Sequence, residues 1–392
     1  MIDDEDCDVG WPCPVDDDCI RPHGIVRSPP GQLAHSSLAT VIPVVRFISQ
    51  LKKTLKARVI APATLKTYDD YFHVVSSSFP PQFQMQSDTH LEPHTLNVVF
   101  SLQAARFHLY RHNLSTNCSS PERIDALRRC LAVALDSVKL ILRSMQPPGS
   151  QLDSQSHVRH LLQDGLSHDQ NWQAYLLSTT SDMLCTHLWR CVLILCFRAE
   201  YAAALACVHV SSTIGDLRRV NIACGRNLAF FLDRLAERIR SGNGSQQQLE
   251  ADEEMLAYVS GDMQGDAENS WVWAGSDTGI KLNSSVSAPL AVDTHHRVNG
   301  EIVEGVPPSH PPSSALLTEK ETKEWGGWER VRGIISSLME EQHSRQQAQY
   351  YHQPAHNMVK RLQLAPPEAP VHTNSSSVSP GGSSRIIIAN II

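Results

Sequence analysis

The sequence has no dense run of basic residues, and its formal net charge is −7 at pH 7 with histidine neutral. A domain that grips nucleic acid through phosphates usually carries a basic patch. The 392 residues are therefore a poor candidate for direct DNA binding. Aromatic residues make up only 6% of the chain, which also holds 23 prolines and 20 glycines. We expect a packed domain with unpacked segments.

Common catalytic and nucleotide-binding motifs are also missing. The sequence has no Walker A loop, no glycine-rich dinucleotide loop, no zincin helix and no nucleophile elbow. The carboxylates of Asp69 and Asp70 are adjacent, so on a helix they diverge by about a quarter turn. We expect no catalytic residue, no cofactor site and no metal site. An all-α metal-dependent or thiol enzyme, using Asp69, Asp70 or Cys224, stays open as an alternative.

The ten cysteines lack the close Cys-x-x-Cys pairs that zinc sites favour. The beginning of the sequence is acidic, unlike a secretory signal. Cys185, Cys191, Cys196 and Cys207 lie within apolar helical patterns, where reduced cysteine behaves as a small buried hydrophobe. We therefore expect a reducing compartment rather than a disulfide framework.

Apolar residues at helical spacing dominate the chain, and no segment shows the clean alternation of a strand. The sequence predicts an all-α, multi-helix bundle-like domain with a disordered linker and tail. Predicted starts include Pro62, and Ser120 as the N-cap before Pro121. One long buried helix is expected from Trp172 to Leu193. Further helices are expected at Ala199–Thr213, Val220–Arg240 and Leu249–Val259. The apolar run from Leu184 to Leu205 is interrupted by charged residues, so we expect no membrane span.

Composition divides the chain into five segments. They are an acidic, proline-rich segment (1–35), a helical domain (36–275), a disordered linker (276–320), an amphipathic helix (321–345) and a low-complexity tail (346–392). Serine, proline, threonine and asparagine dominate the predicted linker, a composition typical of disorder.

Two sets of residues are candidates for a regulatory role. Asp216, Arg218 and Arg226 are expected to form a charged network that either locks a turn between helices or contacts a ligand. Four tryptophans are candidate anchors for a partner protein: Trp271, Trp273, Trp325 and Trp328. For Trp271 and Trp273 the alternative is that they pin the end of the domain onto its body, whereas Trp325 and Trp328 belong to a helix expected to face a partner.

Several short motifs, in their order and spacing, resemble one known family. They include Tyr110-Arg111-His112-Asn113-Leu114 and Val220-Asn221-Ile222-Ala223-Cys224-Gly225-Arg226. A later acidic stretch runs from Asp252 through Tyr258 to Gly265, and Ser270-Trp271-Val272-Trp273 follows it. Together they look like the regulatory (middle homology) domain of fungal zinc-cluster transcription factors. The resemblance covers roughly residues 1–275.

The resemblance implies a helical regulatory region in the nucleus that controls transcription by RNA polymerase II. It implies contacts with the transcriptional machinery, a corepressor or a metabolite, and a homodimer is an open option. Family members read DNA through a six-cysteine zinc cluster, which is not in these residues. Zinc and DNA contact are thus expected only through such a missing module. Two interpretations remain: a truncated factor, or a natural corepressor or scaffold that does not bind DNA.

Overall fold

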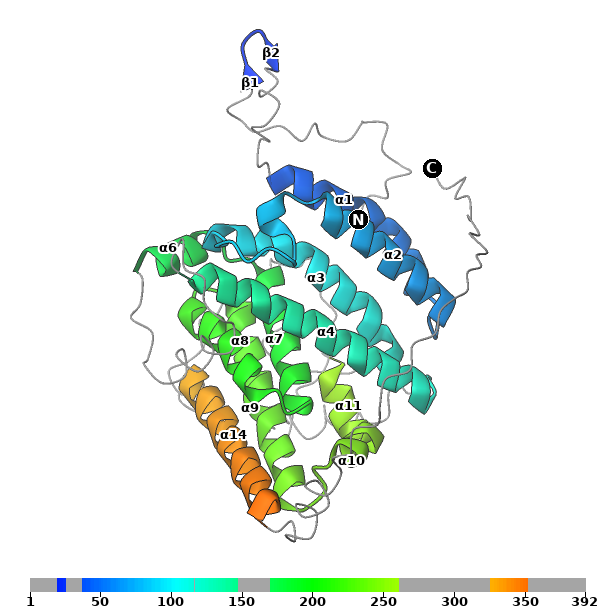
Figure 1. Ribbon diagram of the computed structural model, residues 1–392, viewed down its shortest axis with the longest axis vertical. Coiled ribbons are helices and arrows are strands. Elements are labelled where there is room, and N and C mark those ends of the chain that lie inside the picture. The colour runs from blue at the N-terminus through cyan, green and yellow to red at the C-terminus, as the bar shows by residue number, and fades with distance from the viewer. Residues whose placement is uncertain (1–19, 26–36, 116, 147–169, 261–324, 352–392) are drawn as a thin grey trace, which may run out of the picture. The chain divides into compact units, whose positions relative to one another are not determined.

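The computed structural model describes residues 20–25, 37–115, 117–146, 170–260 and 325–351, and helices dominate these ranges (Figure 1). The predicted all-α class is confirmed. The chain divides into a unit of residues 1–342 and a unit of residues 343–392. The α-helices are α1 (Ser37–Thr54), α2 (Pro62–Ser78), α3 (Leu96–Arg111), α4 (Ser120–Met145), α6 (Gln170–Thr179), α7 (Asp182–Phe197), α8 (Tyr201–Ile214), α9 (Arg219–Arg240), α10 (Gln246–Ala251), α11 (Glu253–Val259) and α14 (Gly327–Tyr351).

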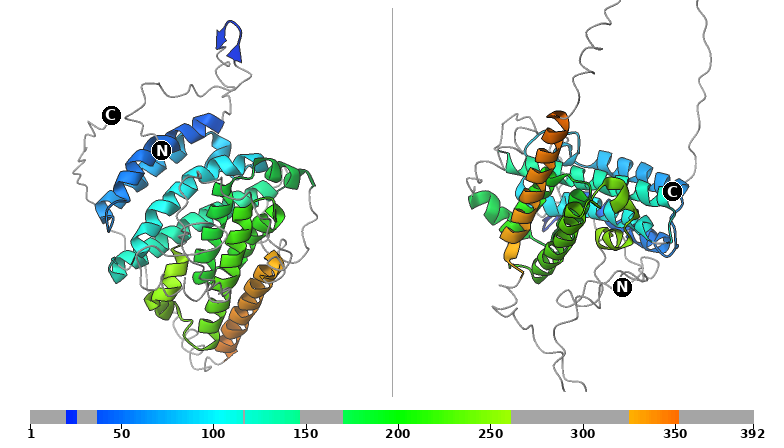
Figure 2. Two further views of the ribbon diagram at one scale, coloured as in Figure 1. Left: turned by 180° about the vertical axis from the view of Figure 1, so that it is seen from behind. Right: turned by 90° about the horizontal axis from the view of Figure 1, so that it is seen from below.

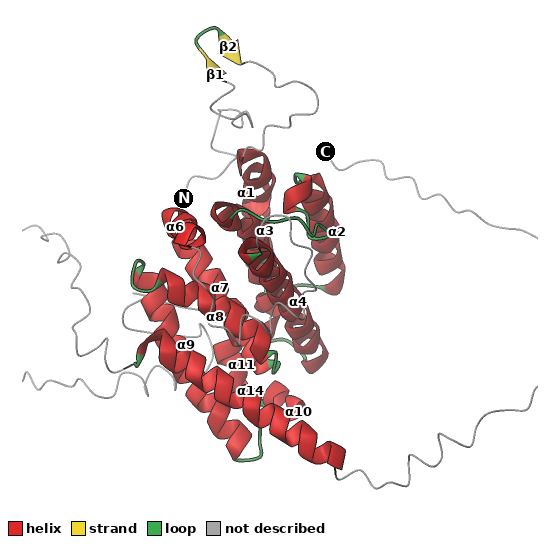
Figure 3. Cartoon of the chain, turned by 60° about the vertical axis from the view of Figure 1, so that its left-hand side comes forward, coloured by secondary structure: helices red, strands yellow, loops and turns green. Residues whose placement is uncertain are grey.

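Short elements complete the described residues. The 3-10 turns are η3 (Pro81–Phe83), η4 (Pro93–Thr95) and η5 (His112–Leu114). The strands β1 (Ile20–Arg21) and β2 (Gly24–Ile25) form an antiparallel hairpin within the acidic, proline-rich segment (Figure 3). Both strands are exposed and have two residues each, so the hairpin adds nothing to the core.

The single helix expected from Trp172 to Leu193 is wrong, because the structure has two helices, α6 and α7, bent by 111° at their break. The Ser181 hydroxyl accepts a hydrogen bond from the Leu184 N–H at 3.2 Å and so caps α7. The Thr180 hydroxyl donates to the Leu176 carbonyl at 2.8 Å at the end of α6. An N-cap in the middle of an apolar pattern ends one helix and starts another, which periodicity alone does not show.

Side-chain caps also shift two other predicted boundaries. Ser119, not Ser120, is the N-cap of α4, and its N–H donates to Glu122 Oε2 at 2.7 Å as in a capping box. The helix expected from Leu249 to Val259 is two helices, α10 and α11. Asp252 separates them, because its carboxylate accepts from the Met255 N–H at 3.1 Å.

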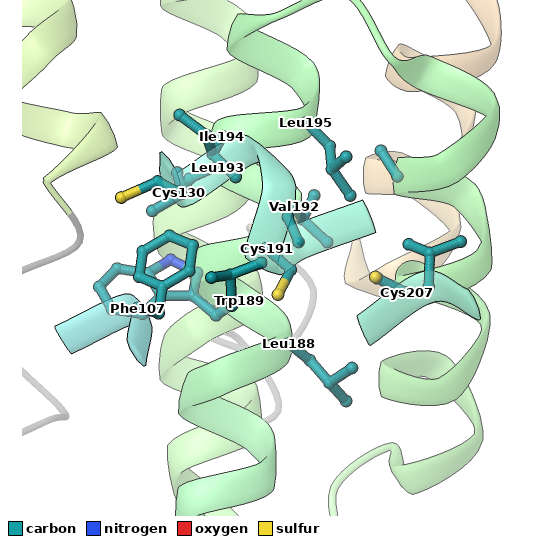
Figure 4. Packing of buried hydrophobic residues seen from close by; sticks show 14 of the residues in the cluster. Phe107, Cys130, Leu188, Trp189, Cys191, Val192, Leu193, Ile194, Leu195 and Cys207 are labelled. Atoms are coloured by element: carbon teal, nitrogen blue, oxygen red, sulfur yellow. The ribbon is translucent and has the colours of Figure 1, made fainter. Parts of the chain in front are cut away.

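Helix α7 lies at the centre of the core, in contact with α3, α4, α8, α9 and α11. Figure 2 shows these helices from two further sides. Trp189, Cys191 and Leu193 are at most 1% exposed, and Figure 4 shows them with Phe107, Cys130 and Cys207 of the neighbouring helices. With an apolar surface nearly all round, α7 is a fully buried helix rather than an amphipathic one.

The seven cysteines within the described residues are all free and buried. This confirms that Cys185, Cys191, Cys196 and Cys207 are buried, as expected. Burial raises the pKa of Cys185 and of Cys191 to about 12 in each case, so these thiols stay protonated at neutral pH.

Within the described residues, no single helix has both the length and the apolar character needed to cross a bilayer. Helices α6 and α7 meet the two criteria, length and apolar character, only when they are counted together as a pair bent at its break.

Candidate functional site

The motif at the end of α3 holds the loop between α1 and α2. Asn113 is buried, and its amide oxygen accepts from the Ile60 N–H at 2.9 Å while its Nδ2 donates to the Ile60 carbonyl at 2.8 Å. The Asn113 side chain therefore satisfies both backbone hydrogen-bonding groups of Ile60, which lies 53 positions earlier in the chain. His112 Nε2 lies 2.7 Å from the Ala57 carbonyl oxygen in the same loop.

Tyr110 belongs to the same motif and joins α3 to α2 through Asp69. Its hydroxyl donates to Asp69 Oδ1 at 2.5 Å, and burial, with this hydrogen bond, raises the tyrosine pKa. Arg129 of α4 donates to Asp69 Oδ2 and, at 2.6 Å, to Asp125 Oδ2. Both oxygens of Asp69 are thus committed to structural partners, whereas Asp70 is exposed. The two carboxylates, each a candidate of the enzyme alternative, thus lie in different surroundings.

An arginine clasp holds the acidic stretch of α10 and α11 against three other segments. Arg238 of α9 donates to Asp252 at 2.9 Å and to Glu254 at 2.6 Å. The other members of the clasp are Arg123 of α4, which binds Glu253 at 2.5 Å, and Arg198 after α7, which binds Glu250. The arginine side chains are only 14–22% exposed, so solvent screens these pairs less than it screens surface pairs.

The two motif-bearing segments meet directly at Arg111. Its Nη1 donates to the Ser260 carbonyl at 2.9 Å, although the two residues lie 149 positions apart. The Arg111 side chain also contacts His108 Nδ1 at 3.2 Å. The Arg111–Ser260 bond joins the end of α3 to the end of α11, next to the clasp, so two of the motifs quoted for the resemblance, residues 110–114 and 252–260, meet here.

The expected network of Asp216, Arg218 and Arg226 is not present as a set of ion pairs. All three side chains lie within the described residues, and no ion pair there joins one to another. Arg218 instead donates to the Thr180 carbonyl at 2.7 Å. Buried Asn221 holds the turn, because its Nδ2 donates to the Ser211 and Gly215 carbonyls at 2.9 and 2.7 Å. A regulatory role for the three charged residues stays a prediction.

Cys224 is fully buried on α9, and burial raises the pKa of its thiol. A nucleophilic cysteine needs an electropositive and partly exposed setting, which this position does not provide. His187 is also buried, with Nε2 2.8 Å from Ser137 Oγ and 3.5 Å from Cys191 Sγ. Burial, and then the nearby Arg190, lowers the pKa of His187 to about 3, so its ring is neutral at physiological pH.

The four candidate tryptophans separate into two pairs. Trp271 and Trp273 lie outside the described residues. Trp325 and Trp328 are 9% and 8% exposed, and their rings meet edge to face with centroids 5.8 Å apart. They lie over Gly225 of α9. In this state they anchor α14 to its own chain, and a role with a partner protein stays a prediction.

The described part of the chain has no group of three or more histidine, cysteine, aspartate or glutamate side chains arranged to hold a metal ion. No known family, curated protein or solved structure matches the chain. The family resemblance therefore stays a prediction, supported by the motifs themselves.

Replacing Asn113 with alanine is expected to lower the free energy of unfolding by about 2–4 kcal/mol. The change leaves the buried N–H and carbonyl of Ile60 without a hydrogen-bond partner, and each such group costs about 1–3 kcal/mol. Urea denaturation followed by circular dichroism measures the effect. Exposed Asn117, whose side chain bonds Ser115 on its own loop and no more distant part of the described chain, is the matched control. Equal losses in Asn113→Ala and Asn117→Ala would contradict the proposed role of Asn113.

Proposed function

We propose that this chain is the helical regulatory domain of a transcriptional regulator related to the fungal zinc-cluster factors. It acts in the nucleus by contacts with proteins of the transcriptional machinery, with a corepressor, or with a metabolite. Zinc and direct DNA reading belong to a six-cysteine module outside these residues.

The observation that carries the proposal is the meeting of the motifs at Arg111 and the arginine clasp. Residues 110–114 and 252–260 were singled out by resemblance alone, and the Arg111–Ser260 bond joins them. Their other polar side chains bind neighbouring helices and loops, as Tyr110 binds Asp69 and Glu253 binds Arg123. Such an arrangement supports a role in fixing helix positions more than a role in turning over a substrate.

A fusion assay tests the proposal. The full chain is joined to an unrelated DNA-binding module, and reporter transcription is compared with that from the module alone. We expect a change of at least about fivefold, the lower end of typical coupling between two sites. Transcription that stays the same, both on a silent reporter and on one driven by an added activator, would contradict the proposal.

A corepressor or scaffold that does not bind DNA is the second candidate. The net charge of −7 and the lack of a dense basic run fit both candidates, because in neither do these residues themselves contact phosphates. The genomic sequence upstream of the codon for Met1 distinguishes the two candidates. An in-frame exon with six paired cysteines supports the zinc-cluster factor, and an upstream stop codon with no such exon supports the scaffold.

A further inference from the structure

Trp325, just before α14, and Trp328 within it place their indole rings on Gly225, the one glycine of α9. An added Cβ at Gly225 would lie 2.5 Å from Trp325 Cη2, closer than real Cβ atoms approach, and 3.2 Å from Trp328 Cζ2, a tight contact. Glycine therefore makes the hollow that the indoles fill. Helices α9 and α14 lie side by side in two views (Figures 1 and 2).

The rest of the contact follows the helix-in-groove pattern. Val331, Ile335 and Leu338 are at most 3% exposed and continue the buried face of α14 after the indoles. Arg330 donates to Asp233 of α9 at 2.6 Å, at the exposed rim of the contact. Aromatic anchors in a pocket, an aliphatic stripe and a charged rim are the features by which an amphipathic helix binds a partner protein.

Two observations mark this contact as weaker than the rest of the core cluster to which the two indoles belong. The buried Nε1 atoms of Trp325 and Trp328 have no acceptor among the described residues, a cost that undocking relieves. The Arg330 and Asp233 side chains are 40% and 51% exposed, so the rim pair is weak.

We propose that the face of α9 around Gly225 is a helix-binding groove and that α14 is its resident, reversibly bound ligand. The ligand that fits it is an amphipathic helix with two tryptophans three residues apart and an arginine two residues after the second. A partner helix of this chemistry displaces α14 and exposes its aromatic face. The proposal does not depend on a transcriptional role.

Tethering explains why α14 fills the groove in the isolated chain. A ligand that belongs to the same chain binds intramolecularly, which favours it over a free competitor of equal affinity. A free competitor therefore binds detectably only when the resident helix is weakened. This gives a clear expectation for peptide binding in trans.

The first test compares two leucine substitutions in the full chain by hydrogen exchange. Gly225→Leu fills the hollow, so α14 should lose its amide protection while α7 keeps its own. Gly333→Leu is the matched control, because Gly333 is an exposed glycine within α14 and its Cβ meets nothing within 4 Å. Loss of protection in α7 together with α14, or unchanged protection of α14 in Gly225→Leu, overturns the proposal.

The second test measures binding in trans with a fluorescent peptide of residues 321–345. The full-chain variant W325A/W328A frees the groove, and we expect it to bind the peptide at least about tenfold more tightly than the unsubstituted chain does. Adding Gly225→Leu should abolish this binding. Equal binding by all three proteins, or none by W325A/W328A when its α7 amides are still protected, contradicts a groove. If W325A/W328A loses protection throughout α7, α14 is part of the core and the proposal fails.

Discussion

Replacing Arg143 with methionine is expected to lower the free energy of unfolding by about 3–5 kcal/mol. Arg143 is 3% exposed, and its guanidinium donates to the carbonyls of Thr89, Gln84 and Gln82 at 3.1, 3.0 and 2.5 Å. Methionine fills much of the space but leaves these carbonyls without a donor, at about 1–3 kcal/mol for each one that water cannot reach.

Arg128 offers a control for Arg143 on the same helix. Its side chain is 67% exposed and pairs with Asp125 within α4, so Arg128→Met should change the free energy of unfolding by no more than about 0.5 kcal/mol. Urea titrations of both variants provide the comparison. A loss below about 1 kcal/mol for Arg143→Met would show that the loop of residues 82–89 keeps its place without the guanidinium.

Lowering the pH from 6.5 to 4.5 is expected to cost about 4–6 kcal/mol of stability through His187 and His108 together. Both have a pKa lowered from 6.5 to about 3, His187 by burial and then Arg190, and His108 by burial and then Arg111. The folded rings stay neutral, whereas the unfolded chain takes up both protons below pH 6.5. Each proton contributes about 1.4 kcal/mol per pH unit, so stability is full above pH 6.5 and falls as the pH drops towards 3.

The variant His187→Leu removes one of the two histidines that take up a proton on unfolding. Between pH 6 and pH 4, the slope of its unfolding free energy against pH should be smaller than that of the unsubstituted chain by about 1.4 kcal/mol per pH unit. Denaturant titrations at four pH values give both slopes. The comparison holds even if the substitution lowers stability at every pH. Parallel slopes would mean that His187 is already protonated in the folded protein.

The helices were predictable because their signals are local. Pro62 and Pro121 lie at helix starts as expected, and the buried face of α2 carries Leu65, Tyr68, Phe72 and Val75 at helical spacing. The breaks at Ser181 and Asp252 were missed because apolar periodicity continues across each of them. In both places a capping side chain decides the boundary. A serine or aspartate three residues before a buried residue was a readable signal for these caps.

The contacts that build the candidate site were not predictable from local pattern. Asn113 pairs with Ile60, Arg111 with Ser260, and Trp325 with Gly225, and each of these pairs is separated by more than fifty positions. A single sequence shows which residues are polar or small, but not which distant backbone they meet. Motif resemblance located the regions around Tyr110 and Asp252, and it gave no signal for Arg143.

The buried cysteines of this protein can be used to measure local unfolding. The thiolate is the form of cysteine that attacks alkylating reagents, and burial, which raises the pKa of Cys130, Cys196 and Cys224, holds these thiols protonated. Each becomes reactive only when the helices around it separate. Because these cysteines lie on α4, α7 and α9, the order in which they are alkylated in rising denaturant reports which part of the body opens first, without any introduced label.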